Sequence, residues 1–364
     1  MKNYTIPMMP GPVKISPAAH PFLIADFGAG YAEDEFFGTY GTVSRKIQTL
    51  IGTEQEIIIQ SGEAMAILWG ALKSCVAPGD KVLCISTGFF GAGFADMAQA
   101  LQAQVEVVSY EYDETLHDLD RIEAKIKTFA PKVITVVHCE TPSGTLNPLV
   151  ELGRLKKKYA VPILIVDAVA SIACTPVTSD AWNADIVMGG SQKGLSLPPT
   201  LGFCSVSEQA WGVIHERGYA GYEAFAPWHR LLDTKEHPNT PDWNGIAALE
   251  AVLDELAAEG WEHVYDRHSR VAEFVRNSLQ EAGYRLFPKP SAVQSPSVTA
   301  AYVPEGLSFA AFDAQVRKDG LGVAGSFGPL AGKIFRLGHM GTQATMENAA
   351  AALAVLKKVR FVQQ

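Results

Sequence analysis

Short apolar runs alternate with longer amphipathic stretches between residues 53 and 207. The runs are rich in β-branched residues and show no apolar–polar alternation, which is typical of strands buried on both faces. We expect seven strands, at residues 56–60, 81–86, 105–110, 132–138, 163–167, 185–188 and 202–206. Helical spacing of apolar residues lies between them, at 64–74, 93–100, 118–128 and 149–159. This order predicts an α/β fold whose mainly parallel seven-stranded sheet carries helices on both faces.

The pattern changes after about residue 210. A long connection rich in aromatic residues spans 219–243, and amphipathic helices are expected at 246–259 and 261–282. The remaining sequence predicts strand, helix, strand and helix, at residues 297–303, 309–318, 333–337 and 345–359. We therefore expect a large domain at residues 15–245, and a small C-terminal α/β domain at residues 246–364 that also includes an N-terminal arm, residues 1–14.

Composition narrows the classes of function. At 364 residues the chain can bury the cores of two domains. A net charge of −9 excludes binding of nucleic acid or anionic lipid through bulk charge. No apolar run reaches the length of a membrane span, so we expect a cytoplasmic protein. Five widely spread cysteines, without a CxxC pair or metal-ligand spacing, indicate a reducing compartment and neither disulfides nor bound metal.

Two charged residues directly follow predicted strands of the sheet. Asp167 ends the apolar run at 163–167, and Lys193 follows the run at 185–188 and two glycines. Taken singly, a lysine of this kind is usually a surface residue and an aspartate a helix cap. A lysine and an aspartate at adjacent strand ends are, however, what pyridoxal chemistry needs: an amine for a Schiff base and an anion for the pyridinium nitrogen.

Other polar residues fall at equivalent positions. Ser61, Thr87 and Thr141 come just after three further predicted strands. In open α/β sheets ligands bind outside the carboxyl ends of the strands. We therefore expect these residues, Asp167 and Lys193 to surround one binding site.

Eight short motifs are distributed over nearly the whole chain, at residues 10–12, 61–62, 87–91, 138–145, 166–171, 190–193, 240–241 and 336–341. In this order they resemble the class V aminotransferases, which are pyridoxal-phosphate enzymes of fold type I. The likeness is greatest to the alanine–glyoxylate and serine–pyruvate transaminases. The segments around Lys193 and Arg336 are its most specific parts. The resemblance implies an aminotransferase that moves an amino group from a small α-amino acid to glyoxylate or pyruvate.

The resemblance also implies roles around the coenzyme ring. Lys193 would form the Schiff base with pyridoxal phosphate and then move the proton between Cα and C4′. Asp167 would keep the ring nitrogen protonated. Phe90 would stack on one face of the ring and Val169 would pack on the other, although Phe90 could equally be a core residue. Thr141 would hydrogen-bond the ring hydroxyl, or simply form a turn before a proline.

The phosphate and the substrate have their own candidates. The resemblance places the phosphate at the N-terminus of the helix that follows Ser61 and Gly62, with Glu63 and Gln192 beside it. His237 and Thr240 match positions that reach the phosphate from the partner subunit, which implies a homodimer with shared sites. Arg336 would bind the substrate carboxylate as a bidentate pair, and Gly11 would lie beside the substrate.

Glu63 departs from the pattern of many relatives, which have Thr or His at this position. A carboxylate beside a phosphate is repulsive unless it turns away or meets a cation. Glu63 could be an acidic first-turn residue, which is favoured at a helix N-terminus. The segment also resembles pyridoxamine–pyruvate transaminase, which uses unphosphorylated vitamin B6 as a substrate. Against that alternative, Phe327 stands where an additional Arg is expected in that enzyme.

Two other functions fit the sequence less well. A cysteine desulfurase or lyase of the same fold needs a mobile cysteine near the small domain, and no cysteine follows Cys204. A non-enzymatic homologue would be expected to have lost Lys193, Asp167 or Arg336, and all three are present.

Overall fold

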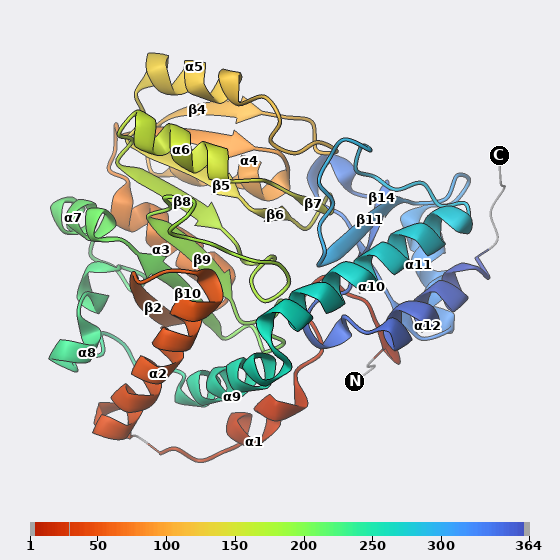
Figure 1. Ribbon diagram of the computed structural model, residues 1–364, viewed down its shortest axis with the longest axis horizontal. Coiled ribbons are helices and arrows are strands. Elements are labelled where there is room, and N and C mark those ends of the chain that lie inside the picture. The colour runs from red at the N-terminus through yellow and green to blue at the C-terminus, as the bar shows by residue number, and fades with distance from the viewer. Residues whose placement is uncertain (1–3, 29, 360–364) are drawn as a thin grey trace.

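A seven-stranded sheet forms the centre of the protein, as the computed structural model, which describes residues 4–28 and 30–359, shows in Figure 1. The strands run in the spatial order β2-β10-β9-β8-β5-β3-β4. In chain order they are β2 (Glu56–Ser61), β3 (Lys81–Ser86), β4 (Gln104–Ser109), β5 (Val133–Val137), β8 (Ile163–Asp167), β9 (Ile186–Gly190) and β10 (Leu201–Val206). The seven predicted strands are thus confirmed, with small shifts at their ends.

One strand runs against the others. β10 pairs antiparallel with both β2 and β9, whereas the pairs β9–β8, β8–β5, β5–β3 and β3–β4 are parallel. The sheet is therefore mainly parallel, as predicted. Since the β9–β10 connection only needs to turn the chain back, no crossover helix lies between them.

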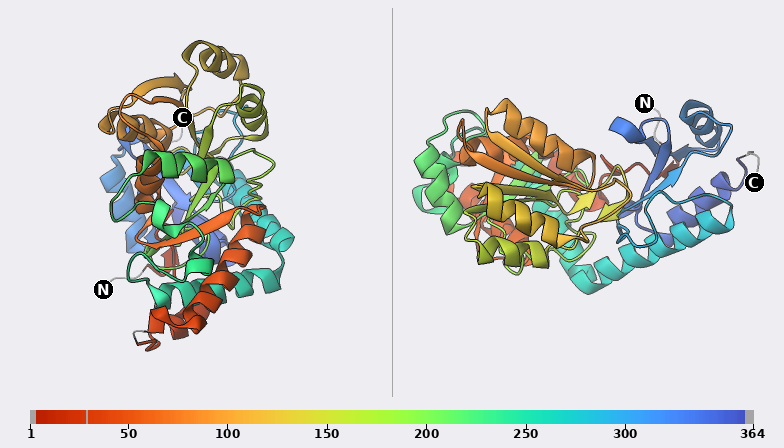
Figure 2. Two further views of the ribbon diagram at one scale, coloured as in Figure 1. Left: turned by 90° about the vertical axis from the view of Figure 1, so that its left-hand side faces the viewer. Right: turned by 90° about the horizontal axis from the view of Figure 1, so that it is seen from above.

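Helices cover both faces of the sheet, as the two views in Figure 2 show. Residues 1–260 contribute α1 (His20–Leu23), α2 (Asp34–Ile51), α3 (Ala64–Cys75), α4 (Phe89–Ala100), α5 (Leu119–Phe129), α6 (Val150–Lys158), α7 (Glu208–Arg217), α8 (Leu231–Thr234) and α9 (Trp243–Glu259). The predicted helices at 64–74, 118–128 and 149–159 differ from α3, α5 and α6 by only one residue at either end.

Helix α2 was not predicted from the sequence. Its buried side chains include Phe36, Tyr40, Val43 and Ile47, which recur at helical spacing. A left-handed Gly52 ends the helix, as is common for a C-cap glycine. The signal was therefore present, although two glycines inside the helix weaken its local propensity.

The C-terminal part is a smaller α/β unit. A three-stranded antiparallel sheet is formed by β11 (Val298–Tyr302), β14 (Ile334–Gly338) and β13 (Ala324–Gly325). The short strands β1 (Ile6–Pro7) and β12 (Leu321–Gly322) form a parallel pair in this unit. A separate antiparallel pair, β6 (Cys139–Glu140) and β7 (Thr145–Leu146), follows β5 of the large sheet. The helices are α10 (Trp261–Glu281), α11 (Phe309–Lys318) and α12 (Met346–Leu356), and α10 lies along this unit (Figure 1).

Two large apolar clusters correspond to the seven-stranded sheet and to the C-terminal unit. The first surrounds the seven-stranded sheet, and the second includes Met8 of the N-terminal segment and residues of α10, α11, α12 and β14. Helix α9, however, packs its apolar residues into the first cluster, although the sequence placed residues 246–259 in the small domain. The division at residues 14/15 and 245/246 stays a prediction.

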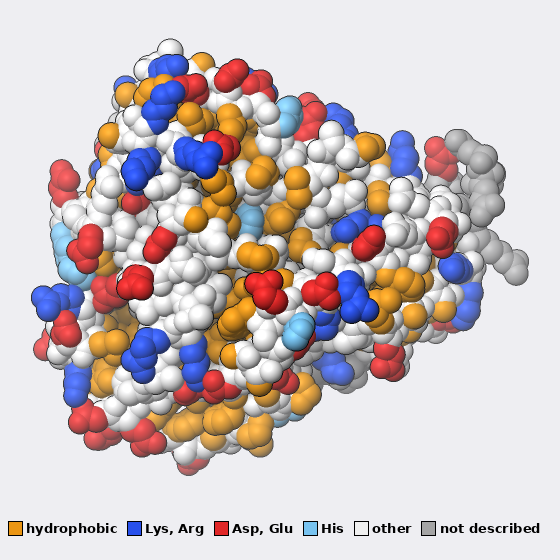
Figure 3. All heavy atoms as spheres, viewed as in Figure 1, with side chains coloured by type: hydrophobic (Ala, Val, Ile, Leu, Met, Phe, Trp, Pro, Cys, Tyr) orange, Lys and Arg blue, Asp and Glu red, His pale blue; other side chains and the backbone are white. Residues whose placement is uncertain are grey.

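The surface does not present a continuous basic area on the face seen in Figure 3, where acidic and basic side chains of the described residues are interspersed. In residues 4–28 and 30–359, no helix is long and apolar enough to cross a bilayer. All five cysteines are buried free thiols.

Candidate functional site

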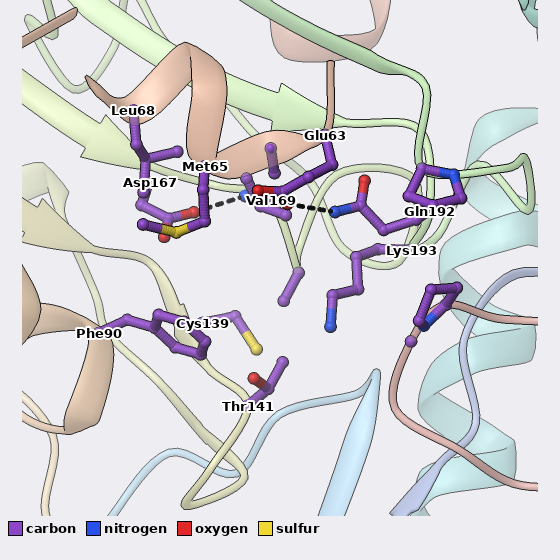
Figure 4. A pocket seen from close by; sticks show the side chains of 15 residues that line it. Glu63, Met65, Leu68, Phe90, Cys139, Thr141, Asp167, Val169, Gln192 and Lys193 are labelled. Atoms are coloured by element: carbon purple, nitrogen blue, oxygen red, sulfur yellow. Dashed lines mark hydrogen bonds between the residues drawn. The ribbon is translucent and has the colours of Figure 1, made fainter. Parts of the chain in front are cut away.

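A cavity of about 350 Å³ lies at the carboxyl ends of the central strands. Its walls come from segments that follow β2, β3, β5, β8 and β9, together with the N-terminal segment. Figure 4 shows the side chains around it, with Lys193 and Asp167 on different sides of the space. The lining residues are Gly11, Pro12, Glu63, Ala64, Met65, Leu68, Phe90, Cys139, Thr141, Asp167, Val169, Ala170, Gln192, Lys193 and Pro199.

Lys193 is the lone cationic side chain among these lining residues. Its Nζ donates a hydrogen bond of 2.5 Å to the carbonyl oxygen of Pro10. A Cβ on Gly11 would lie 2.6 Å from Nζ, so glycine makes room for the lysine side chain. Burial, followed by the charge of Arg336, lowers the pKa of Lys193 to about 8. Lys193 therefore has a larger neutral fraction near pH 7 than an ordinary lysine has.

Asp167 is the last residue of β8, and its side chain is only 6% exposed. The Val169 N–H donates a hydrogen bond of 2.9 Å to its Oδ1, drawn as a dashed line in Figure 4. Burial raises the pKa of Asp167 to about 6, while that N–H and the charge of Lys193 act in the opposite direction. Asp167 is thus an anion at pH 7 in a poorly hydrated place.

Phe90 owes its position to a residue that sequence reasoning gave no role. The carboxylate of Glu140 accepts the N–H groups of Phe90 at 3.1 Å and Gly91 at 2.7 Å, which caps the first turn of α4. Helix α4 therefore begins at Phe89, not at residue 93 as predicted. A Cβ on Gly88 would lie 2.5 Å from the Glu140 carboxyl carbon, so this cap needs glycine there. Burial raises the pKa of Glu140 to about 7.

Glu63 points toward Gln192 at one end of the cavity (Figure 4). The Gln192 Nε2 donates a hydrogen bond of 3.3 Å to the Glu63 carboxylate, and the Gln192 Oε1 is buried without a partner. Glu63 is the N-cap residue of α3 but makes no side-chain cap. The Ser61 hydroxyl, in contrast, accepts the Asp242 N–H at 3.0 Å. The first N–H groups of α3 thus have no side-chain acceptor among the described residues.

Arg336 lies beside the cavity and does not line it. Its side chain is almost fully buried, and its Nε donates to the Gly325 carbonyl oxygen at 2.7 Å. Its Nη1 donates to the Thr141 carbonyl oxygen at 3.4 Å. Within residues 4–28 and 30–359, no carboxylate lies within ion-pair distance of this guanidinium. Burial lowers the pKa of Arg336 to about 10, which leaves it charged at pH 7.

His237 and Thr240 lie apart from the cavity, in a surface hollow that Tyr31 and Tyr222 also line. The ring of His237 packs edge-on against Trp228 and Phe36, at centroid distances of 4.7 and 5.6 Å. Its Nε2 is buried without a hydrogen-bond partner, and burial lowers the pKa of this imidazole. Neither residue therefore contributes to the cavity of its own chain.

The sequence prediction and the cavity overlap in most residues. Eight predicted residues line the cavity: Gly11, Glu63, Phe90, Thr141, Asp167, Val169, Gln192 and Lys193. Six others do not, namely Ser61, Gly62, Thr87, His237, Thr240 and Arg336. The lining residues that were missed are mostly apolar or backbone contributors, such as Met65, Cys139 and Pro199. The described residues contain no cluster of three His, Cys, Asp or Glu side chains able to hold a metal.

Comparison with known proteins agrees with this arrangement. The family model "Aminotransferase class-V" matches residues 30–329. An uncharacterized aminotransferase of Methanocaldococcus jannaschii is 34% identical, over 92% of this chain and 87% of its own length. The pyridoxamine–pyruvate transaminase of Mesorhizobium japonicum is 30% identical, over 96% and 90% of the two chains.

A solved structure extends the similarity to three dimensions. The crystal structure of the ureidoglycine–glyoxylate aminotransferase of Bacillus subtilis superposes with a TM-score of 0.93 at 28% identity, and covers 98% of this chain and 92% of its own. The family match includes the segments that carry Lys193 and Asp167. Fold, site and sequence therefore agree that the chain belongs to the class V aminotransferases and is a transaminase of the pyridoxal-phosphate-dependent fold type I.

Proposed function

We propose that the protein transfers an amino group from a small α-amino acid to glyoxylate or pyruvate. The observation that carries the proposal is the cavity in which a buried lysine with a lowered pKa and a buried carboxylate lie on different sides. Glyoxylate and pyruvate occur in the names of the similar enzymes of Bacillus subtilis and Mesorhizobium japonicum. The cavity walls are otherwise largely apolar, which suits a small substrate with one carboxylate.

The residues present fit the ring of pyridoxal phosphate. When bound, the coenzyme supplies an aldehyde that carries the amino group and a ring that accepts electrons. In our proposal Lys193 would hold the coenzyme through its aldehyde carbon and would carry the proton at the substrate Cα, and Asp167 would hold the proton on the ring nitrogen. Phe90 and Val169 orient the ring, and the Thr141 hydroxyl hydrogen-bonds it.

The substrate is held by a different part of the chain in this proposal. Arg336 binds the carboxylate, because its charge is buried and has no carboxylate partner among the described side chains. Gly11, which makes room for the Lys193 side chain, would lie beside the substrate. The phosphate would lie at the N-terminus of α3, after Ser61 and Gly62, where Glu63 makes no side-chain cap.

A second candidate function rests on Glu63. Its carboxylate lines the cavity at the start of α3, where the phosphate of the coenzyme would be, and its side-chain partner there is the neutral amide of Gln192. Two anions at this place repel each other. The second candidate is therefore a transaminase that takes unphosphorylated pyridoxamine as its amino donor and pyruvate as its acceptor.

A donor–acceptor screen separates these candidates. Coenzyme-loaded protein is expected to transaminate small α-amino acids with glyoxylate or pyruvate. Coenzyme-free protein is expected to be inactive with pyridoxamine and pyruvate. Protein that purifies without the visible absorbance of bound coenzyme, and that turns over pyridoxamine with pyruvate, would establish the second candidate instead.

Replacing Glu63 tests the phosphate end of the site directly. In Glu63→Thr, removal of one negative charge is expected to tighten binding of pyridoxal phosphate about tenfold, or about 1.4 kcal/mol. Binding of pyridoxal, which lacks the phosphate, should stay the same. Both constants are measured by titrating coenzyme-free protein and following absorbance.

Glu33→Thr is the matched control, because Glu33 is also a helix N-cap glutamate without a side-chain cap, but is exposed and remote from the cavity. It should leave both constants unchanged. Equal effects of Glu63→Thr on the phosphorylated and unphosphorylated ligands would show that Glu63 does not face the phosphate.

We further propose a homodimer in which His237 and Thr240 complete the site of the partner subunit. The support is the unpartnered, buried Nε2 of His237 and the separation of both residues from their own cavity. Mixing inactive Lys193→Ala with inactive His237→Ala protein should restore part of the activity, since one site of a mixed dimer is intact. A fully active monomer in sedimentation experiments contradicts this proposal.

The five buried thiols fit a reducing compartment, which we propose is the cytoplasm.

A further inference from the structure

Three phenylalanines from two parts of the chain meet, and the ring of one of them, Phe327, contacts Arg336. Phe89 and Phe90 begin α4, whereas Phe327 precedes the short helix at Gly328–Leu330 in the C-terminal unit. The Phe327 ring centroid lies 5.5 Å from that of Phe89 and 6.5 Å from that of Phe90. Phe327 is 45% exposed, which is unusual for a ring with two aromatic neighbours and calls for a reason.

The guanidinium of Arg336 packs against one face of the Phe327 ring. The Arg336 Cζ lies 4.7 Å from the ring centroid, within the range of a cation–π contact. The Gly325 and Thr141 carbonyl oxygens take the Nε and one Nη1 hydrogen, as described above. An arginine has five N–H donors, so its remaining Nη hydrogens stay available for a carboxylate. The Phe327 ring and the two carbonyl oxygens together fix the orientation of the guanidinium plane and of its remaining N–H groups.

The segment that carries Phe327 is itself anchored to the wall of the cavity. The Ser326 hydroxyl donates a hydrogen bond of 2.8 Å to the carbonyl oxygen of Pro142, next to Thr141. On the other side, a Cβ on Gly328 would lie 2.9 Å from Phe89, so the backbone approaches that ring closely. Gly328 also has a φ of +54°, which favours glycine. The residues before and after Phe327, Ser326 and Gly328, are thus both in close contact with other parts of the protein.

We propose that Phe327 is a positioning residue for carboxylate binding, because its ring holds the Arg336 guanidinium in place. The ring stacks on Arg336, keeps water from one face of the guanidinium and orients its free N–H groups toward the substrate. The inference deepens the proposed function and rests on the role of Arg336 stated there.

The test compares Phe327→Leu with Phe327→Tyr in the coenzyme-loaded enzyme. Leucine keeps an apolar side chain but loses the π face, whereas tyrosine keeps it. In Phe327→Leu we expect the KM for pyruvate and the Kd for propionate, titrated by coenzyme absorbance, to rise about tenfold, which corresponds to about 1.4 kcal/mol. The value of kcat should change by less than about twofold, because the ring supports binding and not the chemical step.

Phe129→Leu is the matched control. It removes a similar contact, in which Lys81 lies 5.4 Å from the Phe129 ring, at the start of β3 and away from the cavity. This variant and Phe327→Tyr should both bind propionate like the wild type. Unchanged propionate binding in Phe327→Leu, or equal losses in the Leu and Tyr variants, would overturn the inference.

Arg336→Leu shows which proposal has failed. If Arg336→Leu weakens propionate binding strongly while Phe327→Leu does not, the inference falls and the proposed function stands. If Arg336→Leu also leaves propionate binding unchanged, the carboxylate binds elsewhere, and the inference and the proposed role of Arg336 both fall, whereas amino transfer itself is tested by Lys193→Ala.

Discussion

The Lys193→Ala variant is expected to lose transaminase activity by a factor of at least about 10⁴, since alanine offers neither a nucleophile nor a proton carrier. Lys193 is the lone amine on the cavity wall, and its Nζ is held by the Pro10 carbonyl oxygen. Another lining residue cannot take its place, because the remaining titratable groups there are the carboxyls of Glu63 and Asp167 and the thiol of Cys139. Single-turnover measurements with a saturating amino donor give the rate.

Two further variants make this result specific. Lys193→Arg keeps a positive charge but not a neutral amine, and should be almost as inactive as Lys193→Ala. Lys157→Ala removes an exposed lysine on α6 and should retain full activity. Retention of more than about 1% of the wild-type rate in Lys193→Ala would contradict the proposed role of the amine.

The pKa of Lys193 adds a pH dependence that does not require the coenzyme. Burial and Arg336 lower this pKa to about 8, and the neutral amine is the form that reacts with aldehydes. In coenzyme-free protein, the rate at which a small aldehyde is trapped on Lys193 should therefore increase with pH and level off above about 8. Surface lysines should continue to gain reactivity up to about pH 10.

The Asp167→Asn variant has the second largest expected effect, a loss of about 10² to 10³ in rate. Asparagine keeps the shape and can still accept the Val169 N–H, but it carries no negative charge to hold a proton on the ring nitrogen. The rate of the amino-donor half-reaction is the measurement. A change in folding is excluded if the variant unfolds at the wild-type temperature.

Lowering the pH should reduce the activity of the wild-type enzyme for the same reason. Burial raises the pKa of Asp167 to about 6, so its negative charge is present above this pH and is lost below it. Activity should decrease as the pH falls through about 6. The residual activity of Asp167→Asn should not show this decrease. Asp96→Asn, at an exposed position of α4, is the control. Activity of Asp167→Asn above a tenth of the wild-type rate would rule out an essential charge at this position.

The centre of the fold and of the site could be predicted because two local rules coincide there. Continuous β-branched runs identify strands buried on both faces, and residues just after such runs lie at the carboxyl edge of the sheet. Asp167 and Lys193 follow from these rules without any information on contacts. The same rules predicted Thr141, which also lines the cavity, whereas Glu63 was predicted only from the family resemblance.

The remaining features depend on information that a local pattern does not carry. The direction of β10 was not anticipated, since an apolar run looks the same in a parallel and an antiparallel strand. Pro10 acts through its carbonyl oxygen, which every residue has. Glu140 acts through backbone N–H groups of a helix about 50 residues away in the sequence. Arg336 needs the packing of the C-terminal unit before its distance from the cavity is defined.

The N-terminal arm sets an order of events for a chain that is still being synthesised. Ile6 pairs with Leu321, and further along the arm the Val13 N–H donates to the Gln192 carbonyl oxygen at 3.1 Å. At about 10 residues per second, the ribosome reaches Leu321 roughly half a minute after Ile6. Lys193 therefore leaves the ribosome before the arm that carries Pro10 has its partner strand. A nascent chain has the reactive lysine but an incomplete wall, and the arm finds its partner strand only after Leu321 has been synthesised.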